Sequence, residues 1–334
     1  MAATAGIIGY GASIPMGRLS IEDIATRRGR GENPEELKKG FRITSKAVPG
    51  SDEDTATIAI EAAKRAVQRA DINATEIGAI TVGSESHPYA VKPTATIVGE
   101  ALGVGNDYHA ADLEFACKAG TAGLQFVAAM VAARQIKIGL AIGADCSQSR
   151  HGDALEYTAG AGGAAFLVGQ KKSDWIASID DTLSVSSDTP DFWRHAHEDA
   201  PRHAERFTGE PAYFKHVLLA TTRLLERNNL EPKDIHHVVF HMPNGKFPRL
   251  AAKRLGFSES QLKAGLVVET MGNAYSGMVP VGLSSVLDQA RANQRIVVTS
   301  YGSGAGSDAF LLTTTDKLAA VRRRAERVQE LLAV

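Results

Sequence analysis

The chain repeats itself once, and this internal repeat constrains its fold more than any other feature. Four residue pairs define the register: Ile72 with Leu230, Ile77 with Ile235, Cys117 with Asn273, and Leu140 with Ile296. The first two pairs give a shift of 158 (230−72, 235−77) and the other two a shift of 156 (273−117, 296−140). The two shifts are almost equal, which predicts two similar halves, roughly residues 1–170 and 171–334, that pack against each other.

Strand and helix patterns alternate along both halves, which indicates the α/β class. In the first half we predict strands at 7–10, 77–82, 113–116, 139–143 and 164–168, and helices at 54–69 and 118–134. In the second half we predict a helix at 213–228, strands at 235–240, 265–269 and 296–300, and a helix that ends near residue 293. A ligand site is expected at the seam between the halves, near the carboxyl ends of strands.

Two segments depart from this alternation. Residues 185–212 are polar, rich in Pro and His and poorly periodic, so we expect a long loop that either covers a site or is solvated. Residues 316–334 predict an amphipathic helix that packs on its own domain or presents a partner surface. Its apolar face would comprise Leu318, Val321, Val328, Leu331 and Leu332.

Charge and cysteine content exclude several classes of function. The 334 residues carry a formal net charge of -1, so the chain has no basic field for nucleic acid or an anionic membrane. Cys117 and Cys146 offer neither a disulfide framework nor a CxxC metal pair, which favours a reducing cytoplasm. The first residues do not read as a signal peptide, and no run of about 18 apolar residues predicts a membrane span.

Cys117 is the candidate nucleophile. In the segment LEFACKAGTAGLQF it stands between a predicted strand and an Ala/Gly-rich helix. The first turn of a helix leaves N–H groups unpaired and carries partial positive charge, and both effects favour a thiolate. A buried, inert cysteine is the alternative. Cys146, in GADCSQS, also ends a strand, but no helix pattern begins there.

His241 is the candidate partner from the second half. It is the last residue of a predicted strand, before Pro243, and it is followed by four cations: Lys246, Arg249, Lys253 and Arg254. In a neutral protein this local cluster suits the phosphates of a CoA, although a solvated helix face would look the same. A metal site of His236, His237 and His241 is disfavoured because strand alternation places them on different faces.

Three further segments supply candidate polar groups at the seam. Asn273 is the repeat partner of Cys117 and can cap a helix or donate its side-chain amide to a thioester carbonyl. The glycine loop SYGSGAGS at 300–307 can turn N–H groups toward a ligand and form an oxyanion hole with the Cys117 N–H. Glu85 follows a strand in the segment that corresponds to His241, and an enclosed carboxylate there can be a general base.

Together, motifs spread over nearly the whole chain resemble the thiolase superfamily of condensing enzymes, most closely the archaeal type of hydroxymethylglutaryl-CoA synthase. These motifs are GIIGYGASIP, VPGSDEDTATIA, GSESHPYAVKPTA, LEFACKAGTAGLQ, YTAGAGGAAFLVG, RFTGEPAYFKHV, FHMPNGKFP, GNAYSGM and SYGSGAGSDAF. The resemblance implies a five-layer αβαβα fold, a cytoplasmic homodimer, and CoA thioesters as substrates without a bound cofactor or metal. It also implies a complex with an acetoacetyl-CoA thiolase and a zinc-ribbon/OB-fold scaffold protein.

The resemblance further implies a reaction of the mevalonate pathway and assigns residues to it. Cys117 would take acetyl from acetyl-CoA, Glu85 would remove a proton from the acetyl methyl, and His241 would hold acetoacetyl-CoA. Substrate contacts would come from Asn273, Ser303, Thr158 and Thr208, and CoA contacts from Lys246, Arg206 and Arg249.

Alternatives are distinguished by how the carbon nucleophile is made. Thiolases use a second cysteine in a CxGxG loop, where this chain has YGSGAG. Ketoacyl synthases of type III use Cys, His and Asn and need no base, so Glu85 favours the synthase. A C-acyltransferase of the same superfamily remains open. An oxidoreductase based on GYGASIP lacks the third glycine of the dinucleotide fingerprint, and a scaffold without activity would not need Glu85, Cys117 and His241.

Overall fold

One mixed sheet contains nine strands in the order β11-β12-β13-β8-β1-β7-β6-β4-β5 in the computed structural model, which describes residues 3–333. The strands of the first half are β1 (Gly6–Ser13), β4 (Ile77–Gly83), β5 (His109–Leu113), β6 (Ile138–Cys146) and β7 (Ala161–Gly169). Those of the second half are β8 (Ala177–Ser186), β11 (His237–Phe240), β12 (Arg295–Thr299) and β13 (Gly306–Thr314).

The two ends of this sheet have the same pairing pattern. In the first half β4 is parallel to β6, β6 is antiparallel to β7, and β7 is antiparallel to β1. In the second half β11 is parallel to β12, β12 is antiparallel to β13, and β13 is antiparallel to β8. β1 and β8 join the ends by pairing over Gly6 and Ile7. Strands of both halves belong to this one sheet, so the sheet itself does not mark where one half ends. The boundary at residue 170 therefore stays a prediction.

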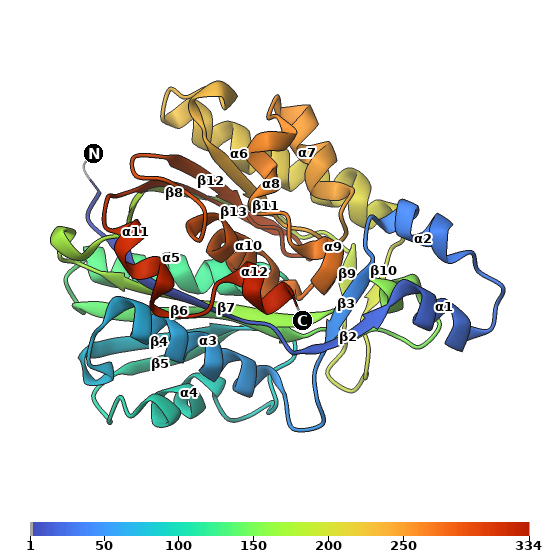
Figure 1. Cartoon of the computed structure of the whole chain (residues 1–334), viewed down its shortest axis with the longest axis horizontal. Coiled ribbons are helices and arrows are strands. Elements are labelled where there is room, and N and C mark those ends of the chain that lie inside the picture. Colours follow the sequence, from blue (N-terminus) through green and yellow to red (C-terminus); the bar gives the residue numbers. More distant parts are fainter. Residues whose placement is uncertain (1–2, 334) are drawn as a thin grey trace.

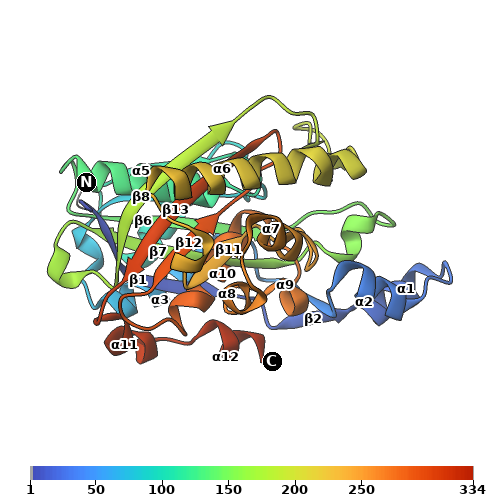
Figure 2. The same ribbon diagram turned by 90° about the horizontal axis from the view of Figure 1, so that it is seen from above.

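Helices alternate with the two groups of strands and give a layered α/β fold (Figure 1). The main helices are α3 (Thr55–Ala70), α4 (Thr94–Leu102), α5 (Ala119–Ala132), α6 (Phe214–Arg227), α7 (Phe247–Leu255) and α10 (Met278–Leu287). α3 packs on β1, β6 and β7, whereas α6 packs on β8, β12 and β13. α5 and α10 contact each other and lie between the two groups, which Figures 1 and 2 show.

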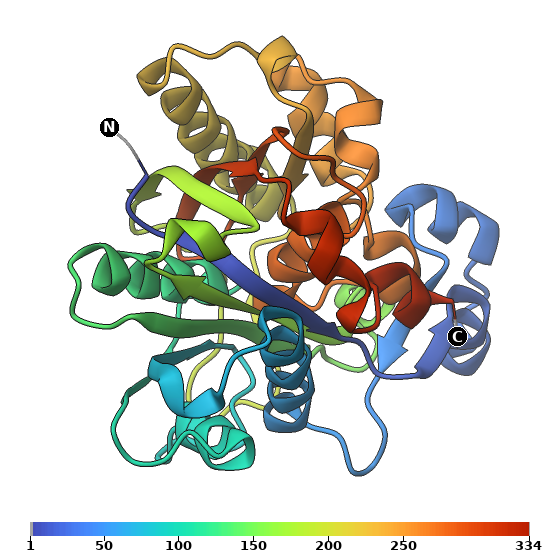
Figure 3. The same ribbon diagram turned by 60° about the vertical axis from the view of Figure 1, so that its left-hand side comes forward.

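The smaller elements extend from these layers. An arm of β2 (Gly17–Ser20), β3 (Ser45–Val48), α1 (Ile21–Arg28) and α2 (Pro34–Phe41) lies at one side of the molecule (Figures 1 and 3). A hairpin is formed by β9 (Phe192–Trp193) and β10 (Arg202–His203). The short helices are η1 (Ala74–Glu76), η2 (Ala154–Tyr157), η3 (Lys172–Asp174), η4 (Thr208–Tyr213), η5 (Pro232–Asp234), α8 (Glu259–Lys263), α9 (Val268–Met271), η6 (Tyr275–Gly277), α11 (Leu318–Val321), η7 (Arg322–Arg324) and α12 (Val328–Leu332).

Small residues bring the central elements close together. Asp54 caps α3 by accepting the Thr57 N–H, as its position before the helix predicts. A Cβ on Gly11 would stand 2.2 Å from the Ala62 carbonyl oxygen, so glycine lets β1 lie directly against α3. A Cβ on Gly120 would stand 2.6 Å from the Cα of Gly143, so α5 sits equally close to β6.

Three predicted elements are wrong in detail. The strand expected at 113–116 lies earlier, because β5 ends at Leu113. The strand expected at 265–269 is absent from the structure, where the short helix α9 begins at Val268. The helix expected at 316–334 is divided into α11, η7 and α12, because Ala325 is extended (φ −145°). Its apolar residues nevertheless pack on the core: Leu318, Val321, Val328 and Leu331 are buried.

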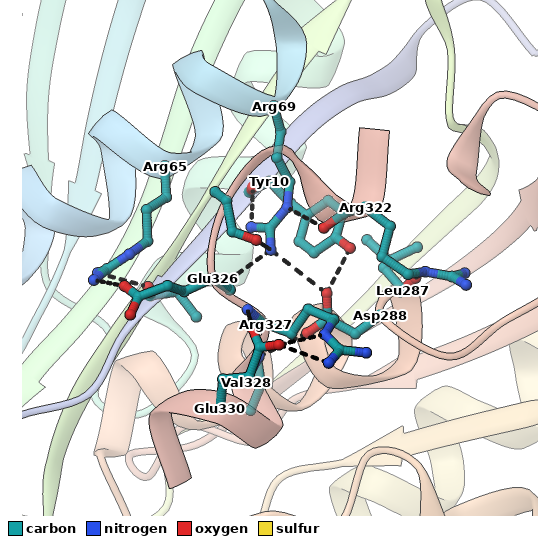
Figure 4. Close-up of polar contacts among 12 residues, drawn as sticks. Tyr10, Arg65, Arg69, Leu287, Asp288, Arg322, Glu326, Arg327, Val328 and Glu330 are labelled. Atoms are coloured by element: carbon teal, nitrogen blue, oxygen red, sulfur yellow. Dashed lines mark hydrogen bonds and ion pairs between the residues drawn. The ribbon is translucent and has the colours of Figure 1, made fainter. Parts of the chain in front are cut away.

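A buried charged cluster fixes this C-terminal segment to both halves (Figure 4). The Arg69 guanidinium, from α3, donates to the Tyr10 carbonyl (2.9 Å) and to the Glu326 carbonyl (2.7 Å). It lies 3.6 Å from Asp288 Oδ1, and both side chains are almost fully buried. Asp288 Oδ2 in turn accepts the Val328 N–H that opens α12 (2.7 Å). The cluster therefore joins β1, α3, the end of α10 and α12.

Candidate active site

Cys117 lies in a tight turn that leads from β5 into α5, and its exposed fraction is 7%. Ala116 has a φ of 45°, a left-handed conformation that is uncommon for a residue with a side chain. The turn is closed by the Lys118 N–H, which donates to the Phe115 carbonyl (3.2 Å), and by the Ala119 N–H, which donates to the Ala116 carbonyl (3.1 Å). It presents the thiol at the beginning of a buried helix, as the sequence predicts.

The glycine loop 300–307 packs directly on this turn. A Cβ on Gly302 would stand 2.4 Å from the Phe115 carbonyl oxygen and 3.1 Å from the Lys118 nitrogen, so only glycine permits the approach. Ser303 follows Gly302 directly in the chain. The loop is therefore in place beside Cys117, while its use as an oxyanion hole stays a prediction.

Glu85 lies close to the Cys117 thiol, and each group affects the pKa of the other. It follows β4, where the sequence places it, and it is half-buried. Burial first, and the neighbouring Asp145 second, raise the pKa of Glu85 to about 8, whereas the Cys117 thiol and Arg194 act in the opposite direction. Glu85 Oε1 is buried and has no hydrogen-bond partner within residues 3–333. A carboxyl with this pKa can both accept and return a proton near neutral pH.

The structure differs from the sequence on the state of Cys117. The position at a helix N-terminus predicts a thiolate, but burial and the Glu85 carboxylate raise the pKa of Cys117 well above its ordinary value. The resting side chain is therefore the thiol. Its proton has to move to a base when the sulfur attacks a thioester.

Asp145 is a member of the site that sequence analysis missed. It is fully buried near the end of β6, next to Cys146. Its carboxylate accepts the Ser84 and Ser86 hydroxyls (2.6 Å each), the Glu85 N–H (2.8 Å) and the Ser276 N–H (2.7 Å). Burial raises the pKa of Asp145 despite these hydrogen bonds. The only signal in the sequence is an acid within the otherwise apolar end of a predicted strand.

His241 directly follows β11 and is 1% exposed. Burial lowers the pKa of His241 to about 3, so the imidazole is neutral. Its ring lies 6.5 Å from that of Tyr213 and 6.4 Å from that of Tyr301. Nδ1 is buried without a hydrogen-bond partner within residues 3–333. A neutral ring with a free nitrogen is available to hydrogen-bond an acyl carbonyl.

Tyr301 links His241 to the cysteine. Besides its contact with His241, Tyr301 is close enough to Cys117 that the sulfur contributes to raising the pKa of the tyrosine. The Tyr301 hydroxyl donates to Asp191, which is fully buried and also accepts the Gly304 N–H (2.8 Å). Tyr301 thus lies near both His241 and Cys117, and Glu85 lies near Cys117 from a third segment, while the catalytic roles of the three residues stay predictions.

Asn273 is buried at the same seam, but it is not the structural counterpart of Cys117. Its Oδ1 accepts the Tyr275 N–H (3.0 Å), and its backbone N–H donates to the Thr158 carbonyl (2.6 Å). α5 begins at residue 119 and α10 at residue 278, a shift of 159 (278−119), and the left-handed Ala116 and Tyr275 share it (275−116). Ser276 thus corresponds to Cys117, and its hydroxyl caps the cysteine's helix by accepting the Gly120 N–H (2.8 Å).

Comparison with known proteins decides the family. The chain is 54% identical to a hydroxymethylglutaryl-CoA synthase of Methanococcus maripaludis, over 98% of this chain and 93% of the relative. It is 58% identical to the synthase of Thermoplasma volcanium (98% and 92% covered) and 58% identical to that of Archaeoglobus fulgidus (94% and 90% covered). The chain belongs to the hydroxymethylglutaryl-CoA synthase family. It is therefore an acyl-CoA condensing enzyme, and the archaeal-type resemblance is confirmed.

The fold comparisons confirm the thiolase-like architecture. A structure described as MvaS in complex with 3-hydroxy-3-methylglutaryl coenzyme A matches with a TM-score of 0.90 at 24% identity, covering 100% of this chain and 89% of the other. The ketoacyl synthase FabH of Pseudomonas aeruginosa matches with a TM-score of 0.86 at 18% identity, covering 93% and 98%. Residues 225–314 also match the family model of 3-oxoacyl-[acyl-carrier-protein (ACP)] synthase III, C terminal.

The residues that the sequence analysis predicts to contact CoA lie in two places. Lys246 and Arg249 line a cavity of about 630 Å³ together with Arg42 and Lys253. Lys246 is exposed, whereas Arg249 already pairs with Glu269 at 3.0 Å. Arg206 is exposed in the segment 185–212 and does not line that cavity. The CoA-binding roles of Lys246, Arg249 and Arg206 stay predictions.

The remaining predicted residues are structurally engaged. Thr158 is 4% exposed and accepts the Asn273 N–H through its carbonyl. The Thr208 hydroxyl donates to the Asp191 carbonyl (2.9 Å). The substrate-contact roles of Thr158 and Thr208 stay predictions. His236 and His237 bond to Arg295 and Gln294, and no group of metal-ligating side chains is found within residues 3–333. No described helix is long and apolar enough to cross a membrane.

Proposed function

We propose that the chain condenses acetyl-CoA with acetoacetyl-CoA and water to give 3-hydroxy-3-methylglutaryl-CoA and CoA, as a step of the mevalonate pathway. In the first stage the Cys117 sulfur attacks acetyl-CoA, the acetyl–sulfur bond to CoA breaks, and the thiol proton leaves with the CoA sulfur. No resident cofactor takes part, because the thioesters supply the reactive carbon.

Glu85 performs the proton transfers of the second stage. Its carboxylate removes a proton from the acetyl methyl, and the resulting carbon attacks the ketone of acetoacetyl-CoA. The protonated Glu85 then returns its proton to the new alkoxide. Water finally attacks the thioester carbonyl, the bond to Cys117 breaks, and the free carboxyl of the product forms. A pKa near 8 matches a group that must accept and return a proton in one cycle.

His241, Asn273 and Ser303 hold the reacting carbonyls. A neutral His241 donates a hydrogen bond to the acetoacetyl ketone, which gains negative charge as the carbon–carbon bond forms. Asn273 accepts the Tyr275 N–H through its side-chain oxygen, and its side-chain nitrogen would donate to a thioester oxygen. Ser303 and the Cys117 N–H face the acetyl oxygen, and Thr158 and Thr208 border the acyl group.

The observation that carries this proposal is the proximity of the Glu85 carboxyl to the Cys117 thiol in a family member. Intact-mass measurement after incubation with acetyl-CoA tests it. Wild type and Glu85→Ala should gain one acetyl group, and Cys117→Ala none, with Cys146→Ala as the control that still gains one. Only wild type and Cys146→Ala should then consume acetoacetyl-CoA. Normal condensation by Glu85→Ala would remove the base assignment.

A ketoacyl-synthase reaction is the alternative that the relatives do not favour, although residues 225–314 match a model of that family. It predicts that malonyl thioesters lose CO2 on the enzyme and that Glu85→Ala retains activity. A related C-acyltransferase predicts instead that the product keeps the intact acyl group without hydrolysis. Product identification by mass distinguishes the three, and the synthase predicts hydroxymethylglutaryl-CoA alone.

Lys246 supplies charge for the CoA phosphates, assisted by Arg206 and Arg249. Lys246→Ala should raise KM for both thioesters with kcat little changed, because it removes binding shared by ground and transition states. Arg249→Ala should have a smaller effect, since its guanidinium already pairs with Glu269. An unchanged KM in Lys246→Ala would exclude the phosphate role.

The working form is a homodimer in the cytoplasm. β5 is one of the two edge strands of the sheet, and an apolar groove of about 530 Å³ beside it is lined by Leu113, Met130 and the 55% exposed Phe126. A second copy would extend the sheet and cover this groove. Phe126→Asp should produce monomers in analytical ultracentrifugation, whereas Met16→Asp, at another exposed site, should not. Dimeric Phe126→Asp would rule out this interface.

A complex with an acetoacetyl-CoA thiolase and a zinc-ribbon/OB-fold scaffold protein is proposed from the sequence resemblance. Such a complex would pass acetoacetyl-CoA from the enzyme that makes it to the one that uses it. Co-expression of the three chains and native mass spectrometry test it. Separate species at micromolar concentration would argue against a stable complex.

A further inference from the structure

The β9–β10 hairpin of the second half packs against residues of both halves beside the site. The Phe192 ring meets the Tyr275 ring edge to face, with centroids 6.0 Å apart. At the other strand, His203 Nε2 lies 3.1 Å from Asp153 Oδ1. Asp191, just before β9, is the buried acceptor for Tyr301 and Gly304. The hairpin is thus seated beside Cys117, where Phe192 packs against a cluster of Cys117, Ala159 and Tyr275.

Arg194 follows β9 and reaches from this hairpin to the candidate base. Its Nη2 donates to the Glu85 carbonyl oxygen (3.2 Å), and its Nη1 donates to the Glu198 carbonyl oxygen in the same hairpin (3.1 Å). Arg194 and Glu85 both line a cavity of about 440 Å³, and both line a second, small cavity that includes Tyr275. One side chain therefore joins the hairpin to the Glu85 main chain.

Several charged and titratable groups surround Glu85 besides Arg194. Asp145 on β6 and the Cys117 thiol at α5 face it, and Tyr275 is close enough to be affected by it. The larger cavity also contains Glu114 and His87. Among the charges that act on Glu85, Asp145 raises its pKa and Arg194 lowers it. The cation on the hairpin therefore opposes the buried carboxylate beneath the base.

We propose that Arg194 is a positioning residue for Glu85, which it holds by the backbone and supplies with positive charge when the hairpin is seated. The inference rests on the function proposed for Glu85. The segment 185–212 would then control the base, since the fraction of enzyme with an ionised Glu85 depends on how this hairpin is placed. Arg194 acts through Glu85.

The test compares Arg194→Met, Arg194→Lys and Arg202→Gln. Removing the cation should raise the pKa of Glu85, so fewer molecules carry the ionised base at neutral pH. We expect condensation by Arg194→Met to fall about threefold to tenfold near pH 7 and to recover near pH 9, because a tenfold change corresponds to one pKa unit. Arg194→Lys should restore most of the activity. Arg202→Gln removes an equal charge from the same hairpin, where Arg202 pairs with Glu198, and should leave the profile in place.

Acetylation of Cys117, followed by intact mass at each pH, separates this inference from the proposed function. If wild type acetylates and condenses while Arg194→Met has the wild-type pH profile, Arg194 has no such role and the proposed function stands. If wild type fails to condense, the proposed function itself is lost. A loss in Arg194→Met that is equal at all pH values, or that Arg194→Lys does not restore, would indicate a merely structural contact and overturn the inference.

Discussion

Asp145 Oδ1 accepts the backbone N–H of Glu85 at 2.8 Å, so a buried carboxylate holds the main chain of the candidate base. The other oxygen of Asp145 accepts the Ser276 N–H at 2.7 Å, and Ser276 caps the helix that begins after Cys117. One side chain therefore fixes the base relative to the nucleophile's helix and to the second half. Its negative charge also raises the pKa of the base that it positions.

Replacing Asp145 by Asn should move the pH dependence of condensation. The substitution removes a charge that raises the pKa of Glu85, so the rising limb of the rate profile should shift to lower pH by about half to one unit. Ser86→Ala, which removes one hydrogen bond to Asp145 without changing charge, is the matched control. A limb that stays in place in Asp145→Asn while activity remains measurable would contradict the electrostatic role.

Replacing Glu85 by Gln should stabilise the fold at alkaline pH. The folded-state pKa of Glu85, about 8, exceeds the ordinary value of 4.5, so between these values the folded protein keeps a proton that the unfolded chain releases. Wild-type stability therefore falls as pH rises through this window, and Gln cannot undergo this loss. Thermal unfolding should show Glu85→Gln gaining on wild type by about 2 °C or more between about pH 5 and pH 9. Glu100→Gln, the same substitution at an exposed site, is the control. A gain that shrinks with rising pH would refute the raised pKa.

The sequence predicts those parts of the fold in which local pattern and environment agree. The Asp54 cap and the apolar spacing place α3, and the position of Glu85 after β4 is correct because a buried strand ends visibly at Gly83. Residues 265–269 are a short apolar run, and such a run does not distinguish a buried strand from a helix. The repeat register slips by three residues at Asn273 (276−273), because sequence spacing alone cannot locate the left-handed residue that precedes each helix.

The electrostatics of the site could not be predicted in the same way. Asp145 matters because residues 84–86 and Ser276 converge on it, and that convergence is tertiary. The thiol form of Cys117 depends on burial and on the Glu85 carboxylate, which together outweigh the favourable helix terminus. Arg194 could not be found either, since the segment 185–212 has no periodicity that shows where its hairpin turns.

Lys118, the neighbour of Cys117, should be important for stability. Its ammonium lies 3.0 Å from Asp308 on β13, and the exposed fractions of the two side chains are 7% and 0%. Breaking one side of a buried ion pair typically costs about 3–5 kcal/mol, so Lys118→Met should lower the free energy of unfolding by about that amount. Removing both charges in Lys118→Met/Asp308→Leu should recover part of the loss. Urea unfolding at constant m-value measures both variants, and a single variant as stable as wild type would show that the pair contributes nothing.

Arg69 should be far more important to the fold than Arg65, although both extend from α3 toward the C-terminal segment (Figure 4). Arg69 is 1% exposed and satisfies the carbonyls of Tyr10, Ala325 and Glu326. Arg69→Met leaves these acceptors and Asp288 without their donor, so we expect a loss of about 3 kcal/mol or more. Arg65 forms a more exposed pair with Glu326, and Arg65→Met should cost about 1 kcal/mol or less. Because the carbonyls hold α12, limited proteolysis of Arg69→Met should cleave first after residue 315, and equal stability of the two variants would show that the cluster does not anchor this segment.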